Sequence, residues 1–211
     1  MTLTSSDSTT ERKLNVWTQQ QRMILETTYR AFEDAGFDIN SYAGSKTGVF
    51  AGIFTTDYQE MMMQSSQHME LNGHSLIGSC LASNRGSYLF DFQGPSCNVD
   101  TACSSAMIAT HLACDANWNG ECNLAVSCGA NALLRPKIFM TMSQGGFMSK
   151  ECRCKTIDKS ANGYVRSEGA GAVLLKPLSQ ALKDNDKLYA FILGTATNED
   201  GRTNGMPFPQ L

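Results

Sequence analysis

Residues 99–106, V-D-T-A-C-S-S-A, place one cysteine between a short extended segment and the start of an apolar helix. Residues 98–100 are typical of the end of a strand, and residues 103–118 are predicted to form a helix that is apolar on nearly every face. Such a helix is normally buried against other elements. The sequence therefore predicts a strand, a turn and a buried helix, with Cys103 at the helix N-terminus.

The predicted position of Cys103 favours reactive chemistry at its thiol. Unpaired backbone N–H groups and the positive end of the helix dipole favour the thiolate over the thiol. The same N–H groups can stabilise the oxyanion that forms when a thiolate attacks a thioester carbonyl. The neighbours Ala102, Ser104 and Ser105 are small and leave room for an acyl substrate. The alternative is a buried structural cysteine, which is the commoner role of a cysteine at an arbitrary helix start.

The rest of the chain predicts strands that alternate with helices. Strands are expected at residues 48–53, 98–100, 124–128, 170–175 and 188–195, and helices at residues 18–36, 55–73, 75–90 and 103–118. Thr18 and Gln21 fit a capping box at the start of the first helix. Apolar runs without alternation are typical of strands buried on both faces. The alternation predicts a layered α/β fold with a largely parallel sheet.

Composition and charge exclude several classes of function. A formal net charge of −3 gives no basic surface for nucleic acid. The polar residues 1–10 predict no secretory signal, and no apolar run approaches the roughly 18 residues that cross a membrane. The eight cysteines include no C-x-x-C pair, so we expect reduced thiols, no metal site and a cytoplasmic protein. Residues 163–171 are rich in glycine but lack the ending of a phosphate-binding loop.

Segments along most of the chain resemble the β-ketoacyl synthases, or ketosynthases, of type I polyketide and fatty acid synthases. The resembling segments are residues 20–22, 33–36, 48–52, 82–85, 90–96, 99–106, 120–122, 148–149, 163–171 and 198–205. The resemblance implies a thiolase-like fold with α/β/α layers. It assigns residues 17–187 to the N-terminal half with the nucleophile, and residues 188–211 to the first strand and loop of the C-terminal half. Residues 1–16 are expected to be a disordered leader that is unlike the family.

The resemblance also implies an acyltransferase chemistry. Cys103 would accept an acyl group from the phosphopantetheine arm of an acyl carrier protein, and a malonyl-type extender would then lose carbon dioxide and attack the thioester. Tyr164 occupies a place where the family often carries an aromatic residue lining the acyl pocket, although an ordinary core aromatic is an equal alternative. No bound cofactor is implied, and the family predicts a homodimer.

Two features of the family have no counterpart in the sequence. The two histidine motifs that assist condensation would follow Leu211, and His68, His74 and His111 are expected to be structural or solvated. The family's first strand is central in a half-sheet of order 3-2-1-4-5, and residues 1–16 contain no such strand. The strands at 48–53 and 124–128 are therefore expected to face each other unpaired.

Alternative functions remain open at this point. A ketosynthase remnant without catalysis could serve as an interaction or dimerisation piece. A cysteine hydrolase would need a Cys–His pair and an orienting group, and no such signature surrounds Cys103. Starter, extender and product are not specified by the sequence, nor is a polyketide parent distinguished from a fatty acid parent.

Overall fold

A four-stranded sheet occupies the middle of the computed structural model, which describes residues 17–64 and 78–202. The strand order is β2-β1-β3-β4, with β1 parallel to β2 and β3, and with β4 antiparallel to β3. This confirms the largely parallel sheet. The elements in chain order are α2 (Gln19–Asp34), η1 (Ile39–Tyr42), β1 (Thr47–Gly52), α3 (Asp57–Gln64), α5 (Leu81–Phe90), β2 (Ser96–Val99), η3 (Ala102–Ser104), α6 (Ser105–Trp118), β3 (Leu124–Asn131), α7 (Lys137–Gln144), β4 (Gly169–Leu175) and α8 (Leu178–Lys183).

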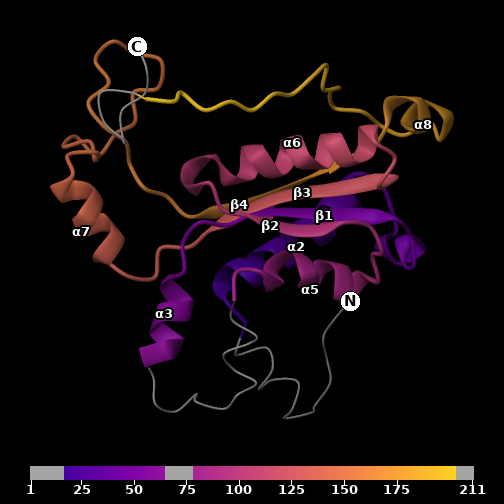
Figure 1. Cartoon of the computed structure of the whole chain (residues 1–211), viewed down its shortest axis with the longest axis horizontal. Helices are drawn as coiled ribbons and strands as arrows, with labels where there is room; N and C mark the ends of the chain where they lie inside the picture. The colour runs from indigo at the N-terminus through magenta and orange to yellow at the C-terminus, as the bar shows by residue number, and fades with distance from the viewer. Residues whose placement is uncertain (1–16, 65–77, 203–211) are drawn as a thin grey trace.

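Helices cover both faces of the sheet and make three layers. Figure 1 shows α6 on one face and α2 with α5 on the other. The predicted capping box begins α2, because the Thr18 hydroxyl accepts from the N–H of Gln21 and the Gln21 side chain accepts from the N–H of Thr18. The layered α/β/α prediction is confirmed.

Two apolar cores hold the layers together, one on each side of the sheet. Beneath α2 and α5 the core is built on large side chains, including Ile24, Phe32, Val49 and Phe92. Against α6 it is built on alanines, and Ala109, Ala113 and Ala116 of the helix are almost fully buried. Small side chains let α6 approach the sheet closely, which brings the backbone before it near the strand ends.

The sheet is continuous even though, among the described residues, it lacks the central strand that the family's strand order predicted. β1 and β3 pair directly with each other, from Thr47 opposite Leu124 to Gly52 opposite Gly129. The expectation of two unpaired edges at this point is therefore wrong. Direct pairing satisfies the backbone donors and acceptors of both strands, and all six residues of β1 are buried.

Helix α6 is less buried than its composition predicted. Met107 is 73% exposed, and Leu112 and Trp118 are also exposed. The prediction of a helix enclosed on nearly every face is wrong, because only one face of α6 lies on the sheet. Strand β4 differs in the same way, since it is an edge strand and Val173 is 50% exposed.

The segment expected to be the last strand, residues 188–195, does not join the sheet. It runs as an extended chain over α6 without ladder pairing (Figure 1). Side chains hold it instead, since the Tyr189 hydroxyl donates to the carboxylate of Asp34 and His111 shares a 2.6 Å hydrogen bond with Thr195. The prediction of a strand is wrong here, because no neighbouring strand in the described chain accepts its backbone hydrogen bonds.

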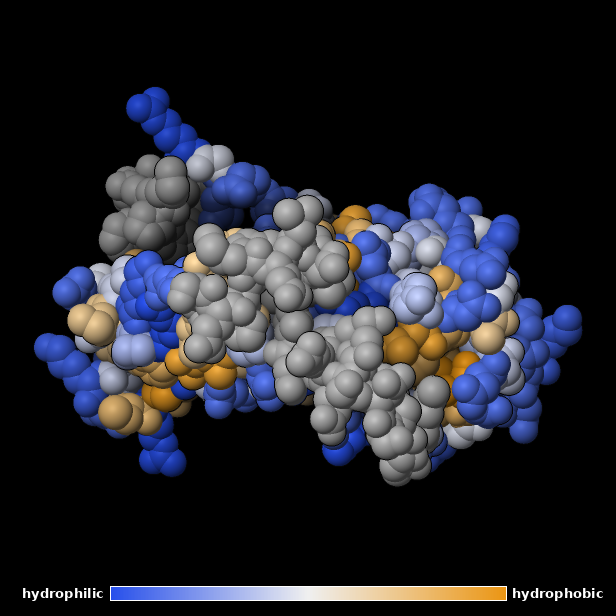
Figure 2. All heavy atoms as spheres, turned by 90° about the horizontal axis from the view of Figure 1, so that it is seen from below, coloured by the Kyte–Doolittle hydropathy of each residue, from blue (hydrophilic) through white to orange (hydrophobic). Residues whose placement is uncertain are grey.

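Other predicted boundaries differ more modestly. The helix expected at 75–90 begins at Leu81 within the described residues, and the helix expected at 55–73 is described only as α3. Helix α7 was not predicted. The leader expected over residues 1–16 lies outside the described residues. Figure 2 shows one face on which hydrophilic side chains dominate both ends and apolar atoms gather in patches.

Two glycines set how close α6 lies to the sheet. A Cβ built on Gly52 would lie 2.5 Å from the backbone nitrogen of Ala106, and one built on Gly129 would lie 2.9 Å from the Ala106 Cβ. At Gly52 the obstacle is helix backbone, which cannot rotate away as a flexible side chain can. Glycine at this position is therefore required for the close approach of α6.

We predict that Gly52→Ala lowers the free energy of unfolding by about 1–3 kcal/mol, because it overpacks the contact between β1 and the start of α6. Urea unfolding monitored by circular dichroism measures the change. Gly171→Ala is the matched control within the same sheet, since nothing lies within 4 Å of its added Cβ. Equal effects of the two substitutions would contradict the explanation.

Candidate functional site

Cys103 lies on a tight turn between a strand and a helix. It is the middle residue of η3, which follows β2 and runs directly into α6, and its side chain is exposed. The preceding residue, Ala102, has φ of 55°, a left-handed conformation that costs a non-glycine residue about 1–3 kcal/mol. The predicted strand, turn and helix are therefore present, and the turn that presents the thiol is strained.

The Ser105 hydroxyl holds this turn in place. It donates to the carbonyl of Ala102 at 2.6 Å and accepts from the N–H of Thr101 at 2.9 Å. Asp100 adds a third contact, because its carboxylate accepts from the N–H of Ala102 at 3.1 Å. Ser105 is 4% exposed, whereas Thr101 and Ala102 are exposed, so the two hydrogen bonds are partly shielded from water. The strained backbone is thus fixed by side chains on both sides of it.

These contacts leave one N–H of the turn unused. The N–H groups of Thr101 and Ala102 donate to side chains, and those of Ser104 and Ser105 donate to the carbonyls of Thr101 and Ala102. The Cys103 N–H has no partner among the described residues. An unused N–H on the residue that carries the thiol is suited to donate to an oxyanion formed at that sulfur.

The thiol borders a cleft of about 1050 Å³. Its floor is formed where β1, β3 and β4 meet the start of α6, and glycines and alanines leave the space open there. Its lining residues are Gly52, Phe54, Ala102, Cys103, Ser105, Ala106, Gly129, Ala130, Asn131, Met142, Phe147, Tyr164, Val165, Arg166, Ser167, Gly169, Ala170 and Gly171. The volume and the mostly uncharged lining fit a small organic ligand such as an acyl chain.

Tyr164 lies on the wall of the same cleft as Cys103. A bridge between Met148 and Tyr164 fixes this wall, with hydrogen bonds from the Ser149 N–H to the Tyr164 carbonyl and from the Tyr164 N–H to the Phe147 carbonyl. Gly163 has φ of 127°, and an added Cβ would lie 2.5 Å from the Ser149 nitrogen. The Tyr164 ring is thereby placed at the cleft, and its role in acyl binding stays a prediction.

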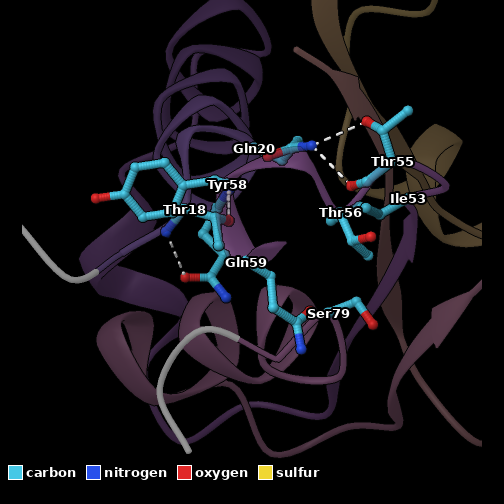
Figure 3. Close-up of a pocket in the computed structure, with 9 residues that line it drawn as sticks. Thr18, Gln20, Ile53, Thr55, Thr56, Tyr58, Gln59 and Ser79 are labelled. Atoms are coloured by element: carbon cyan, nitrogen blue, oxygen red, sulfur yellow. Dashed lines mark hydrogen bonds between the residues drawn. The ribbon is translucent and has the colours of Figure 1, made fainter. Parts of the chain in front are cut away.

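A chain of hydrogen bonds joins the N-terminus of α2 to the cleft. Figure 3 shows the Gln20 side chain donating to both the carbonyl and the hydroxyl of Thr55. The Thr55 hydroxyl then donates to the Asn131 side chain, which in turn donates to the carbonyl of Ser167. Asn131 and Ser167 both line the cleft. The buried end of α2 therefore supports the end of β3 at the site.

The histidines are not brought to the thiol within the described chain. His111 lies in α6, where its ring contacts Thr195 and the carboxylate of Asp115 at 3.2 Å. His68 and His74 lie outside the described residues. In residues 17–64 and 78–202 no group of three or more His, Cys, Asp or Glu side chains could hold a metal ion. Over the same residues no helix has the length and apolar character to cross a bilayer.

The family follows from comparison with known proteins. Residues 4–181 match the family described as "Beta-ketoacyl synthase, N-terminal domain". The chain belongs to the β-ketoacyl synthase family. The match begins within the segment that was expected to be unlike the family. The layered half-domain described above is accordingly the thiolase-like fold of this family.

Relatives at high identity come from polyketide synthases. The chain is 46% identical over 192 residues to the highly reducing polyketide synthase dmxL2 of Cryptosporiopsis sp. (strain 8999), and 43% identical over 190 residues to the partially reducing polyketide synthase men1 of Menisporopsis theobromae. Each match covers 90% of this chain but only 8% and 7% of those proteins. The chain therefore spans less than a tenth of these curated relatives.

A solved ketosynthase has the same fold. The ketosynthase from module 6 of the bacillaene synthase from Bacillus subtilis 168 superimposes with a TM-score of 0.82 at 38% identity. The match covers 95% of this chain and 34% of that one. This chain thus corresponds to about a third of that solved ketosynthase chain.

The sequence predicted that Cys103 lies at the start of a helix, but it did not predict the residues that fix the turn around it. Ser104 and Ser105 were both interpreted as small neighbours, whereas the Ser105 hydroxyl organises the turn. A serine in the first turn of the predicted apolar helix was the available signal. Asn131 had no signal, because its partners Thr55 and Ser167 are distant in sequence.

We predict that Ser105→Ala lowers the free energy of unfolding by about 1–3 kcal/mol, because the N–H of Thr101 and the carbonyl of Ala102 lose a shielded partner. Ser104→Ala is the control, since the Ser104 hydroxyl also bonds to Thr101 but is exposed. Urea unfolding of both variants is the measurement. A smaller effect at Ser105 than at Ser104 would contradict this assignment.

We predict that a limiting thiol reagent labels Cys103 first among the eight cysteines and Cys128 last. Burial raises the pKa of Cys128 to about 12, so near pH 8 this thiol stays protonated until the chain unfolds. Burial also raises the pKa of Cys97 and Cys114. Peptide mass spectrometry after brief alkylation gives the order. Faster labelling of Cys80, which is exposed at the start of α5 but lies outside the cleft lining, would contradict the prediction.

Proposed function

We propose that this chain carries the acyl-accepting centre of a polyketide ketosynthase, with Cys103 as the nucleophile. The observation that carries the proposal is a Cys103 N–H without a partner among the described residues, beside an exposed Cys103 thiol that borders a largely uncharged cleft. A thiolate and an oxyanion donor on one residue are what acyl transfer to sulfur requires. The polyketide synthases that match at 41–46% identity support the substrate class.

The proposed transfer is a thioester exchange. Cys103 Sγ attacks the carbonyl carbon of an acyl thioester on the phosphopantetheine arm of a carrier protein, and the carbonyl oxygen becomes an oxyanion that accepts from the Cys103 N–H. Collapse of this intermediate breaks the carbon–sulfur bond to the arm. The thiol proton of Cys103 ends on the departing pantetheine sulfur, so no cofactor is consumed.

The condensation step needs groups beyond those described. Decarboxylation of a malonyl-type extender develops negative charge on the enolate oxygen, which requires further hydrogen-bond donors. His111 does not supply one, because its two ring nitrogens contact Thr195 and Asp115. We propose that the complete acyltransferase, with its carrier protein and a second copy of the ketosynthase, performs this step in the cytoplasm.

We predict that the 211-residue chain takes one acyl group from an acyl-pantetheine thioester onto Cys103 but forms no β-ketoacyl product when malonyl-pantetheine is added. Each missing donor at a developing oxyanion costs about 10²–10³ in rate. Intact-mass spectrometry detects the acyl adduct, and product analysis by mass spectrometry detects condensation.

Two variants test whether Cys103 is the acylated residue. Cys103→Ala should abolish the adduct, whereas Cys80→Ala, which alters an exposed thiol outside the cleft lining, should retain it. A native-like chain that forms no adduct would overturn the catalytic proposal and favour a non-catalytic interaction piece. A β-ketoacyl product that disappears in Cys103→Ala would show that the chain holds the missing donors.

A further inference from the structure

A single formally charged side chain borders the cleft beside Cys103. Among the described residues that line it, Arg166 is the one Lys, Arg, Asp or Glu. It lies on the segment that leads from Tyr164 into β4. The other lining residues are small, apolar, aromatic or neutral polar. A cation in such surroundings attracts an anion more strongly than it would in open solvent.

Within the described chain the guanidinium of Arg166 has no hydrogen-bonding partner. Its Nε is buried and donates no hydrogen bond, and its recorded contact is with the ring of Phe139 in α7, 5.4 Å from guanidinium carbon to ring centroid. The neighbouring acid, Glu168, accepts from the N–H of Leu133 instead. A guanidinium carries five N–H donors, and leaving buried ones unsatisfied is unfavourable. The pattern is that of a donor set whose acceptor arrives with a ligand.

We infer that Arg166 binds the phosphate group of the phosphopantetheine arm that delivers acyl groups to Cys103. This inference rests on the proposed function, because it assumes that such an arm enters the cleft. The planar fork of an arginine matches two oxygens of a phosphate, which makes this side chain suited to the role. Arg166 is thus a positioning residue that sets the depth and direction of the arm.

A carboxylate on the acyl chain is the other anionic oxygen group that could meet Arg166. In the proposed reaction, however, the extender carboxylate must leave as neutral carbon dioxide. A guanidinium bound to that carboxylate would stabilise the ground state more than the transition state and would slow the loss. A phosphate keeps its charge throughout the reaction, so binding it holds the arm without opposing the chemistry.

Binding to the Cys103→Ala chain separates this inference from the proposed function, because that variant cannot be acylated. Isothermal titration calorimetry compares acetyl-phosphopantetheine with acetyl-pantetheine, which lacks the phosphate. We expect the phosphate to tighten binding about 10- to 100-fold, the range of a hydrogen bond to a charged group. Adding Arg166→Gln should reduce this ratio to near one, and Arg166→Lys should restore part of it.

Control and contrary outcomes are defined by the same titrations. Arg153→Gln removes an exposed arginine outside the cleft lining and should leave the ratio unchanged. Equal affinity for the two thioesters, or a phosphate preference that survives Arg166→Gln, would overturn the inference. Malonyl-pantetheine binding more tightly than acetyl-pantetheine only when Arg166 is present would instead assign the arginine to the acyl carboxylate. An acyl adduct that fails to form on unmodified Cys103 would contradict the proposed function alone.

Discussion

The contact between the backbone of α6 and the carboxyl end of β1 is the constraint on which the site depends. At Gly52 there is no room for even a Cβ, and at Gly129 the Ala106 side chain fills the corresponding space on β3. Alanines farther along α6 keep the same short separation from the sheet. The helix can come no closer to the sheet, and the packing of its alanines keeps it from lying farther away. The turn before α6 is therefore held at a fixed distance from the strand ends.

This fixed distance positions the turn that carries Cys103 as a site for chemistry. Ser105 and Asp100 accept from the N–H groups of Thr101 and Ala102, the two residues before Cys103, and among the described residues the Cys103 N–H is left as a donor beside the sulfur. The cleft exists on that side because glycines and alanines line its floor. Backbone geometry, rather than a cluster of charged side chains, therefore gives the site its chemical character.

Local sequence patterns predicted the elements around Cys103 well, because each depends on contacts within a few residues. The capping box at Thr18 is of this kind, and so is the strand predicted at residues 98–100, which the structure has at Ser96–Val99. The exposed face of α6 could not be predicted in the same way, because the sequence pattern does not show whether another element covers an apolar side chain such as Met107. The direct pairing of β1 with β3 and the Asn131 contacts depend on partners distant in sequence, and so does the extended course of residues 188–195, which side chains of α2 and α6 hold. Only the assembled structure specifies those partners.

The left-handed conformation of Ala102 lowers the stability of the fold but restricts the orientation of the Cys103 sulfur. Glycine would adopt the same φ without strain, yet it would also give the backbone next to the nucleophile access to conformations that alanine forbids. Alanine narrows the directions in which the sulfur can point, at an energetic cost that Ser105 and Asp100 offset. Selection for thermal stability alone would therefore favour a residue at position 102 that aims the nucleophile less accurately.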